Sequence, residues 1–235
     1  MAHAPRTARA IARAELTRAI LERAGDQLAE VGPAALSVRQ VARELEMASS
    51  AVYRYFPSRD ALLTALIVQG YDDLGAEVEA ADAGVRQRSR FDLRWTAVAH
   101  AVRDWARAQP HRYALLYGSP VPGYAAPDDT VPAATRVTGT LVRIIAEAEA
   151  AGCTPVSPVP VTKAERAATA NIRSFVEPGL GDEMAVRGLI AWATLFGHLS
   201  LELFGHMHRG VLDYDAHFAQ VVDQVTADLG LAQAR

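Results

Sequence analysis

Hydroxyl and guanidinium groups suited to binding phosphate gather in residues 36–59, LSVRQVARELEMASSAVYRYFPSR. Serine and tyrosine hydroxyls, arginine side chains and the N–H groups at a helix start all donate hydrogen bonds to phosphate oxygens. Serines also bond base edges, and small methyl-bearing side chains contact thymine methyl groups in a major groove about 12 Å wide. The segment therefore predicts contacts with double-stranded DNA. The residues expected to make them are Ser37, Val38, Arg39, Ala48, Ser49, Ser50, Tyr53, Tyr55 and Arg59.

Two short helices joined by a tight turn are predicted to position these side chains. Ser37 is a suitable N-cap for the first helix, residues 38–45, whose apolar side chains share one face. The second helix, residues 49–55, would enter the groove. Helices this short bury too little surface to be stable alone, so we expect them to pack against longer helices over residues 7–31 and 59–81.

The rest of the chain is also predicted to be helical, because apolar residues recur every three or four positions and no alternating strand pattern occurs. The fold class is therefore all-α: a three-helix DNA-binding domain with a helix-turn-helix, a long connecting fourth helix and a larger helical domain. The expected boundaries are 1–57, 58–83 and 84–235. Beyond the connecting helix, we expect helices over residues 91–109, 111–117, 132–151, 163–176, 181–206 and 213–229.

Composition indicates a globular protein of the cytoplasm. Half of the 235 residues are hydrophobic, and the single cysteine, Cys153, has no partner for an internal disulfide, as expected in a reducing compartment. No apolar signal-peptide core follows the N-terminal arginines. The apolar run over residues 188–204 is shorter than the roughly 20 residues that a membrane span needs. We therefore expect no membrane insertion.

Charge is distributed unevenly along the chain, although the overall net charge is only −3. Residues 1–70 hold nine arginines against seven carboxylates, which makes their net charge +2. Residues 71–235 hold 15 basic and 20 acidic side chains, which makes theirs −5. A positive N-terminal part is the sign expected of an end that faces DNA.

The segment LSVRQVARELEMASSAVYRYFPSRDALLTAL resembles the DNA-binding domain of the TetR family of transcriptional regulators, and the resemblance covers about residues 12–68. The family pattern has Thr or Ser before the second helix, an aromatic run after the recognition helix, and Lys or Arg at the start of the fourth helix. The matching residues here are Ser37, Tyr53, Tyr55, Phe56 and Arg59.

Two residues depart from the family pattern. Glu46 stands where the turn usually carries glycine, and a positive φ there would cost about 1 kcal/mol or slightly more. Ala48 stands where a polar cap is usual, so capping of the recognition helix would pass to Ser49 or be lost. Both departures leave open which serine reads which base.

The resemblance implies that the C-terminal body binds a small ligand and dimerises through the last two long helices. Residues 118–124 and 190–206 are similar to one actinobacterial-style subset of these bodies. Apolar side chains surround most of the helix over 181–206, more than one monomer core readily covers. Together with residues 213–229 it would form an isologous four-helix interface in a homodimer. The expected interface residues are Trp192, Phe196, Leu199, Leu203, Phe218, Val222 and Val225.

Aromatic side chains with a few polar groups are typical of a small-molecule cavity. Each such aromatic side chain is, however, more often plain core than cavity lining. The candidates to line a cavity for an unidentified small-molecule effector are Trp95, His100, Trp105, Tyr113, Tyr117, Tyr124, Asn171, Phe175 and Trp192.

Histidines near the end of the helix over 181–206 raise the question of a metal. His198, Glu202 and His206 fall at i, i+4 and i+8, with His208 two residues on, a spacing that could hold zinc or nickel. A dimer interface explains the helix better, so we expect no metal and no cofactor. No phosphate loop, nucleophile elbow or paired carboxylates indicate an enzyme.

The sequence thus favours a ligand-responsive transcriptional regulator, with repression favoured over activation. We expect a homodimer that binds a near-palindromic operator through the major groove and is released by a small-molecule effector. The alternative is a small-molecule binding or modifying protein whose N-terminal helices make protein contacts. That alternative predicts no salt-dependent binding to DNA.

Overall fold

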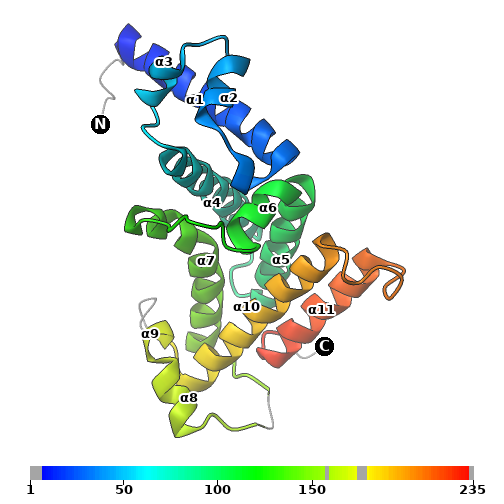
Figure 1. Ribbon diagram of the computed structural model, residues 1–235. Coiled ribbons are helices and arrows are strands. Elements are labelled where there is room, and N and C mark those ends of the chain that lie inside the picture. Colours follow the sequence, from blue (N-terminus) through cyan, green and yellow to red (C-terminus); the bar gives the residue numbers. More distant parts are fainter. Residues whose placement is uncertain (1–6, 157–158, 174–178, 233–235) are drawn as a thin grey trace. The chain divides into compact units, whose positions relative to one another are not determined.

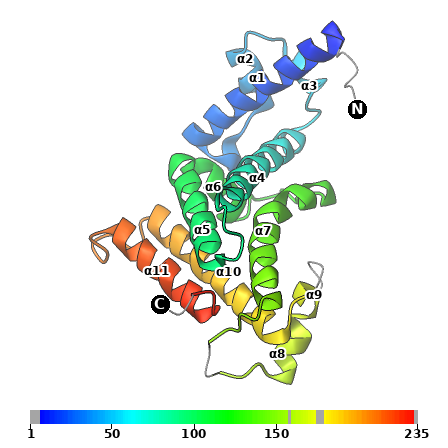
Figure 2. The same cartoon turned by 180° about the vertical axis from the view of Figure 1, so that it is seen from behind.

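The computed structural model describes residues 7–156, 159–173 and 179–232, and within these ranges the only regular elements are helices (Figures 1 and 2). The all-α prediction is confirmed. The chain divides into two compact units. The first extends to Gly70 and includes His111–Val131, and the second holds Tyr71–Pro110 and the chain from Pro132 onward. These units differ from the predicted boundaries, because the long fourth helix is shared and residues 111–131 group with the N-terminal helices.

The first unit begins with α1 (Ala8–Val31), whose N-terminus is capped by the Thr7 hydroxyl. Then follow a 3₁₀ turn (Pro33–Ala35), α2 (Val38–Glu44) and α3 (Ser49–Tyr53), with α2 packed against both α1 and α3. Residues 59–70 of α4 (Arg59–Gly84), α6 (Pro110–Tyr117) and a 3₁₀ turn (Asp128–Thr130) complete the unit. Its core is formed by aliphatic side chains that are fully buried: Ile20, Ala24, Val41, Ala42, Val52, Leu62 and Leu63.

The second unit contains the rest of α4, α5 (Phe91–Ala108), α7 (Val131–Ala150), α8 (Lys163–Ala168), α9 (Ala170–Arg173), α10 (Asp182–Leu203) and α11 (Tyr214–Asp228). Helices α5, α10 and α11 pack against one another, and α10 lies beside α11 in both views (Figures 1 and 2). The helix predicted over residues 163–176 is instead broken at Thr169, and residues 174–176 lie outside the described ranges.

A buried arginine anchors α5 in the second unit. The Arg94 side chain is wholly buried, with Nε 2.7 Å from Asp82 Oδ1 and Nη1 2.6 Å from Glu147 Oε2. Burial alone would raise the pKa of Asp82, but hydrogen bonds from Arg94 and Arg88 outweigh it and hold that pKa below its ordinary value. Arg94, together with Asp82 and Glu147, therefore joins three helices, α4, α5 and α7, through charge-assisted hydrogen bonds.

Helix α10 is the most apolar element of the described chain. By length and composition alone it could cross a membrane, and 44% of its apolar window is buried in the fold. One such helix is weak evidence of a membrane span, because the core helix of a soluble protein has the same properties. Here α10 packs against α5 and α11, as a core helix does.

Candidate nucleic-acid interface and ligand cavity

The turn between α2 and α3 ends α2 in a Schellman motif. The N–H of Glu46 bonds the Arg43 carbonyl at 3.1 Å, and the N–H of Met47 bonds the Ala42 carbonyl at 2.9 Å. This geometry requires a left-handed residue after the C-cap, and Glu46 occupies that place with φ 55°. The sequence left open whether Glu46 adopts a positive φ. The structure shows that it does, so the turn holds a conformation that glycine adopts more readily.

The N-terminus of α3 has no side-chain cap. Ala48 is the N-cap residue, in extended conformation, and no side chain bonds the free N–H groups of the first turn. Of the two outcomes that the sequence allowed, the cap is lost rather than passed to Ser49. The uncapped N–H groups lie beside the exposed side chains of Ala48 and Ser50. This end of α3 therefore presents free backbone donors and a small polar face together.

Ser37 caps α2 as predicted. Its Oγ accepts a hydrogen bond from the N–H of Gln40 at 3.3 Å, while its own N–H donates to Gln27 Oε1 at 2.7 Å. The side chain of Val38 is 3% exposed and belongs to the core, so only the backbone of this residue is available to a phosphate. Arg39, by contrast, is exposed at the start of α2.

Arg59 and Tyr55 have partners inside the first unit that the sequence did not indicate. The Arg59 Nη2 donates to the carbonyls of Pro33 and Ala34, at 2.6 and 3.3 Å, which ties the start of α4 to the turn before α2. The Arg13 guanidinium lies 5.1 Å from the centre of the Tyr55 ring, close enough for a cation–π contact. Tyr53 remains exposed on the last turn of α3.

An apolar cavity of about 240 Å³ opens in the second unit between α5, α7 and α10. Two of the predicted pocket residues, Trp95 and Trp192, line it. The other lining residues are Thr138, Leu141, Val142, Ile145, Ile172, Leu180, Ala185, Gly188 and Leu189. Sequence reasoning missed them because it sought aromatic and polar groups. The facing spacing of 138, 141, 142, 145 on α7 and 185, 188, 189, 192 on α10 is the signal that could have found them.

The remaining predicted pocket residues do not line this cavity. Tyr113, Tyr117 and Tyr124 belong to the first unit, where Tyr113 is fully buried and the Tyr124 hydroxyl bonds the Thr64 hydroxyl at 2.9 Å. In the second unit His100 packs edge-on against Phe218, with ring centres 5.3 Å apart. Trp105 and Asn171 are also absent from the lining, and Phe175 lies outside the described residues. The aromatic character of a residue alone therefore did not show whether it lines the cavity or belongs to the core.

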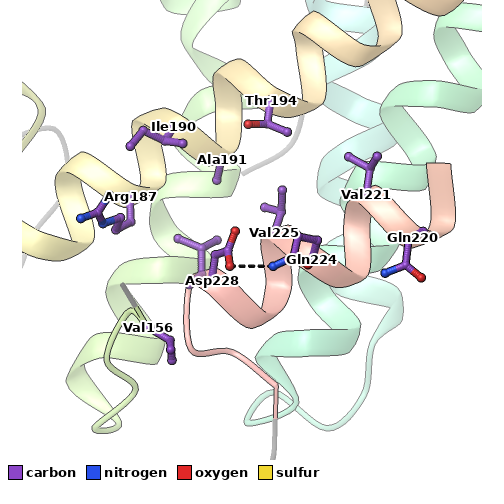
Figure 3. A pocket seen from close by; sticks show the side chains of 11 residues that line it. Val156, Arg187, Ile190, Ala191, Thr194, Gln220, Val221, Gln224, Val225 and Asp228 are labelled. Carbon is purple, nitrogen blue, oxygen red and sulfur yellow. Dashed lines mark hydrogen bonds between the residues drawn. The ribbon is translucent and has the colours of Figure 1, made fainter. Parts of the chain in front are cut away.

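A second hollow, of about 450 Å³, runs along α10 and α11 (Figure 3). Figure 3 shows side chains of both helices bordering it, with a hydrogen bond of 2.8 Å from Gln224 Nε2 to Asp228 Oδ1. The groove is lined by Val156, Arg187, Ile190, Ala191, Thr194, Gln220, Val221, Gln224, Val225, Asp228 and Leu229. Val156 is 70% exposed and Ile190 is 50% exposed, and Ile190 is the most open large apolar side chain that α10 and α11 contribute to this groove. We name this surface the α10/α11 groove.

Most of the predicted dimer residues are buried in the core of their own unit. The exposed fraction is 7% or less for Phe196, Leu199, Phe218, Val222 and Val225. Of these only Val225 borders the α10/α11 groove. Trp192 lines the apolar cavity, and Leu203 is half-buried at the end of α10. Since α10 is apolar on nearly all sides, its sequence did not reveal which stripe faces α5 and α11.

The histidines do not share one helix as their spacing in the sequence suggested. Helix α10 ends at Leu203, so His206 and His208 lose the helical spacing from His198. The His198 ring lies 5.1 Å from that of His217, and its Nε2 is 3.8 Å from Glu202 Oε2. Burial, helped by His217, lowers the pKa of His198 against the pull of Glu202. In the described ranges no three His, Cys, Asp or Glu side chains converge as metal ligands do.

Together α2, the tight turn and α3 form a helix-turn-helix, which places the protein in the class of DNA-binding proteins. Residues 20–66 match the profile of bacterial regulatory proteins of the tetR family, and residues 95–225 match that of the tetracyclin repressor-like C-terminal domain. The chain is 43% identical over 208 residues to HTH-type transcriptional regulators of Mycobacterium bovis and Mycobacterium tuberculosis. Each match covers 86% of both chains.

Solved structures agree with these matches. SCO4313, described as a regulatory protein, has a TM-score of 0.76 at 31% identity, over 94% of this chain and 98% of that one. A regulatory protein of the tetR family from Rhodococcus RHA1 has a TM-score of 0.61 at 17% identity, over 92% and 98%, and shows the shared fold. The chain therefore belongs to the TetR family, and it is a transcriptional regulator rather than an enzyme.

Proposed function

We propose that the protein is a homodimeric repressor that binds a near-palindromic operator and is released by a small-molecule effector. Membership of the TetR family supports the DNA binding in this proposal. The exposed face of α3, with Ala48, Ser50 and Tyr53 beside uncapped N–H groups, is the observation that supports entry into a major groove. We further propose that the protein works in the cytoplasm and without a membrane.

Two kinds of contact support this assignment. The small side chains at the start of α3 would meet base edges, because nothing bulky or charged projects from Ala48, Ser49 or Ser50. Phosphates on one side of α3 would be contacted by the Arg39 guanidinium, the Ser37 hydroxyl and the N–H groups at the start of α2. Phosphates on its other side would be contacted by the Tyr53 and Tyr55 hydroxyls. Arg59 would act partly through its hydrogen bonds to the turn before α2.

Dimerisation would set the spacing of the two recognition helices. A palindromic operator requires two copies of α3 separated by about 34–36 Å or a multiple of it. The α10/α11 groove is the surface that we propose for this contact, with Ile190, Thr194 and Val221 meeting the same face of the second copy. One recognition helix alone would bind weakly, and two held at fixed spacing bind far more tightly.

The apolar cavity supports a role for an effector. A ligand there relieves repression only if it prefers the state that does not bind DNA. A shift from about 1:99 to 99:1 between two states takes roughly 5.5 kcal/mol of such preference. Helices α5, α7 and α10 form the walls of the cavity. A bound effector would therefore change how these three helices pack.

A footprint on the DNA upstream of the protein's own gene, at two salt concentrations, tests the proposal. We expect a protected near-palindrome and a steep loss of affinity with salt, because several phosphates are neutralised. Ser50→Glu should weaken binding by about 1–3 kcal/mol, roughly fivefold to 150-fold, since it places a negative charge in the groove.

Ser89→Glu is the matched control, because Ser89 is also exposed but lies in the second unit. It adds the same charge and should leave the footprint intact. An unchanged footprint with Ser50→Glu would contradict the placement of α3 in the groove. Equal losses in both variants would mean that overall charge, and not a contact of α3, causes the effect.

A further inference from the structure

The first part of α1 extends beyond the core of the first unit. Residues 8–16 are all exposed, and the first fully buried side chain of the helix is that of Ile20. Exposed turns gain no packing energy, so their helicity depends on local propensity and capping. Alanine at positions 8, 10, 12 and 14 and the Thr7 cap supply both. The sequence therefore maintains a projecting helix end that the core does not require.

The stripe of α1 that packs into the core continues along this projecting end as arginine. Its members, spaced three or four residues apart, are Arg9, Arg13, Leu16, Ile20, Ala24 and Leu28. The last three are buried, whereas the first two place positive charge on the same face. Glu15, the carboxylate of residues 8–16, is two residues from Arg13 and so lies on the opposite side of the helix.

Arg13 shows which part of the first unit this stripe faces. Its guanidinium lies 5.1 Å from the centre of the Tyr55 ring, and Tyr55 comes two residues after the end of α3. Helix α3 lies beside the N-terminal half of α1 in both views (Figures 1 and 2). The arginine stripe therefore faces the side of the first unit that carries the recognition helix. Arg9 is one turn further out, about 6 Å beyond Arg13 along the helix axis.

Arg9 contributes no polar contact to the fold. Within the described ranges its side chain forms no hydrogen bond and no ion pair. It also stands in the first turn of α1, which has no acidic residue, although the positive end of the helix dipole favours acids there. A charge that its own helix disfavours and that has no partner in the described chain indicates a negative partner outside it.

We infer that the projecting end of α1 binds the DNA backbone through Arg9, at a phosphate beyond the base pairs that α3 reads. The inference rests on the proposed function, because it places α3 in the major groove. Duplex DNA carries one negative charge per about 1.7 Å of its axis, and a guanidinium donates two parallel hydrogen bonds to phosphate. This contact positions the protein on DNA without reading sequence.

Fluorescence anisotropy with two DNA duplexes tests the inference. One duplex holds the segment protected in the footprint together with its flanks, and the other has the same length and composition in scrambled order. Each lost phosphate contact lowers the slope of log affinity against log salt by about 0.9. We expect Arg9→Ala to lower the slope by this amount for each bound subunit, on both duplexes. Each lost contact weakens binding about fivefold to tenfold near 0.1 M salt.

Two further variants serve as controls. Arg18→Ala removes the same charge from the same helix, but Arg18 lies on the other side of α1, where its Nη1 is 2.6 Å from Glu22 Oε1. It should leave the slope unchanged. Arg9→Lys keeps the charge and should also keep the slope. Since Arg9 is exposed and alanine favours helix, we expect every variant to fold, which far-UV circular dichroism checks.

Shorter flanks on the protected duplex give a second measurement. The unaltered protein should lose affinity when the flanks are removed, because Arg9 then has no phosphate to bind. Arg9→Ala should lose less, since its contact is already absent. Equal losses in the two proteins would contradict the placement of Arg9 beyond the base pairs that α3 reads.

An unchanged salt slope in folded Arg9→Ala would overturn the inference, as would an equal change with Arg18→Ala. A loss confined to the protected duplex would overturn the phosphate assignment, because only base reading depends on sequence. Failure of the unaltered protein to bind either duplex would overturn the proposed function together with the inference. Normal binding with an unchanged slope in Arg9→Ala would overturn the inference alone.

Discussion

Truncation of Ile190 to alanine should weaken the dimer while leaving each subunit folded. Ile190 lies on the α10/α11 groove and is 50% exposed in the single chain. Burial of a whole isoleucine side chain is worth about 1.5–3 kcal/mol, so covering the exposed half contributes about 1 kcal/mol. A two-fold interface uses the residue twice. The expected loss is therefore about 2 kcal/mol, or roughly 30-fold in the dimer dissociation constant.

Analytical ultracentrifugation over a dilution series would measure this constant, and urea unfolding would report the stability of the fold. Leu93→Ala is the matched control, because Leu93 on α5 is 45% exposed and does not border the groove. It should leave the dimer constant unchanged. Leu199→Ala shows how the loss of a core side chain differs from the loss of an interface side chain. Leu199 is 1% exposed, so its truncation should cost about 2–5 kcal/mol of unfolding free energy.

The reasoning would be refuted by a dimer constant that Ile190→Ala leaves within twofold of the unaltered protein. A loss of equal size with Leu93→Ala would also refute it, since the effect would then not belong to the groove. Ile190→Glu extends the test, because a charge that the interface must bury should weaken the dimer further than the alanine does.

Three further predictions concern the stability of the fold. Glu46→Gly should raise the unfolding free energy by about 0.5–1 kcal/mol, because relief of about 1–2 kcal/mol of left-handed strain exceeds the flexibility that glycine adds to the unfolded chain; an unchanged urea midpoint would show that the turn is unstrained. Arg94→Met should cost about 3 kcal/mol, the lower end for a broken buried pair, because Arg88 still bonds Asp82; a urea midpoint equal to that of the unaltered protein would contradict the buried pair. The lowered pKa of His198 means that the unfolded chain binds more protons below the ordinary histidine value of about 6.5, so stability is complete above that pH and falls as the pH drops below it. The His198→Gln variant should therefore lose less unfolding free energy than the unaltered protein between pH 7 and pH 5 in urea titrations. An equal loss in both proteins would show that His198 does not cause the pH dependence.

Local patterns predicted the helices well because helix formation depends on neighbouring residues. The helix-turn-helix follows from the cap at Ser37 and the small face around Ser50, and the strain at Glu46 follows from the missing glycine. The same reasoning predicted every long helix to within a few residues. It placed a helix over 163–176 that the structure breaks at Thr169, because a helical pattern does not reveal where a helix is interrupted.

Partners that are distant in the sequence could not be predicted in the same way. Arg94 lies in an amphipathic helix where an arginine would be expected at the surface, yet it is buried on carboxylates from two other helices. Trp95 and Trp192 are far apart in the chain and line one cavity. The expected aromatic pocket was spread over both units because aromatic side chains serve core and cavity equally.

The sequence by itself determined that this protein is all-helical and contains a helix-turn-helix, because periodicity, capping and turn chemistry are properties of short segments. Its resemblance to the TetR family indicated a DNA-binding regulator. Only the tertiary structure decided which stripe of α10 is buried and which is exposed at the α10/α11 groove. An evenly apolar helix has no internal preference for a face. The packing of α5 and α11 against it makes that choice.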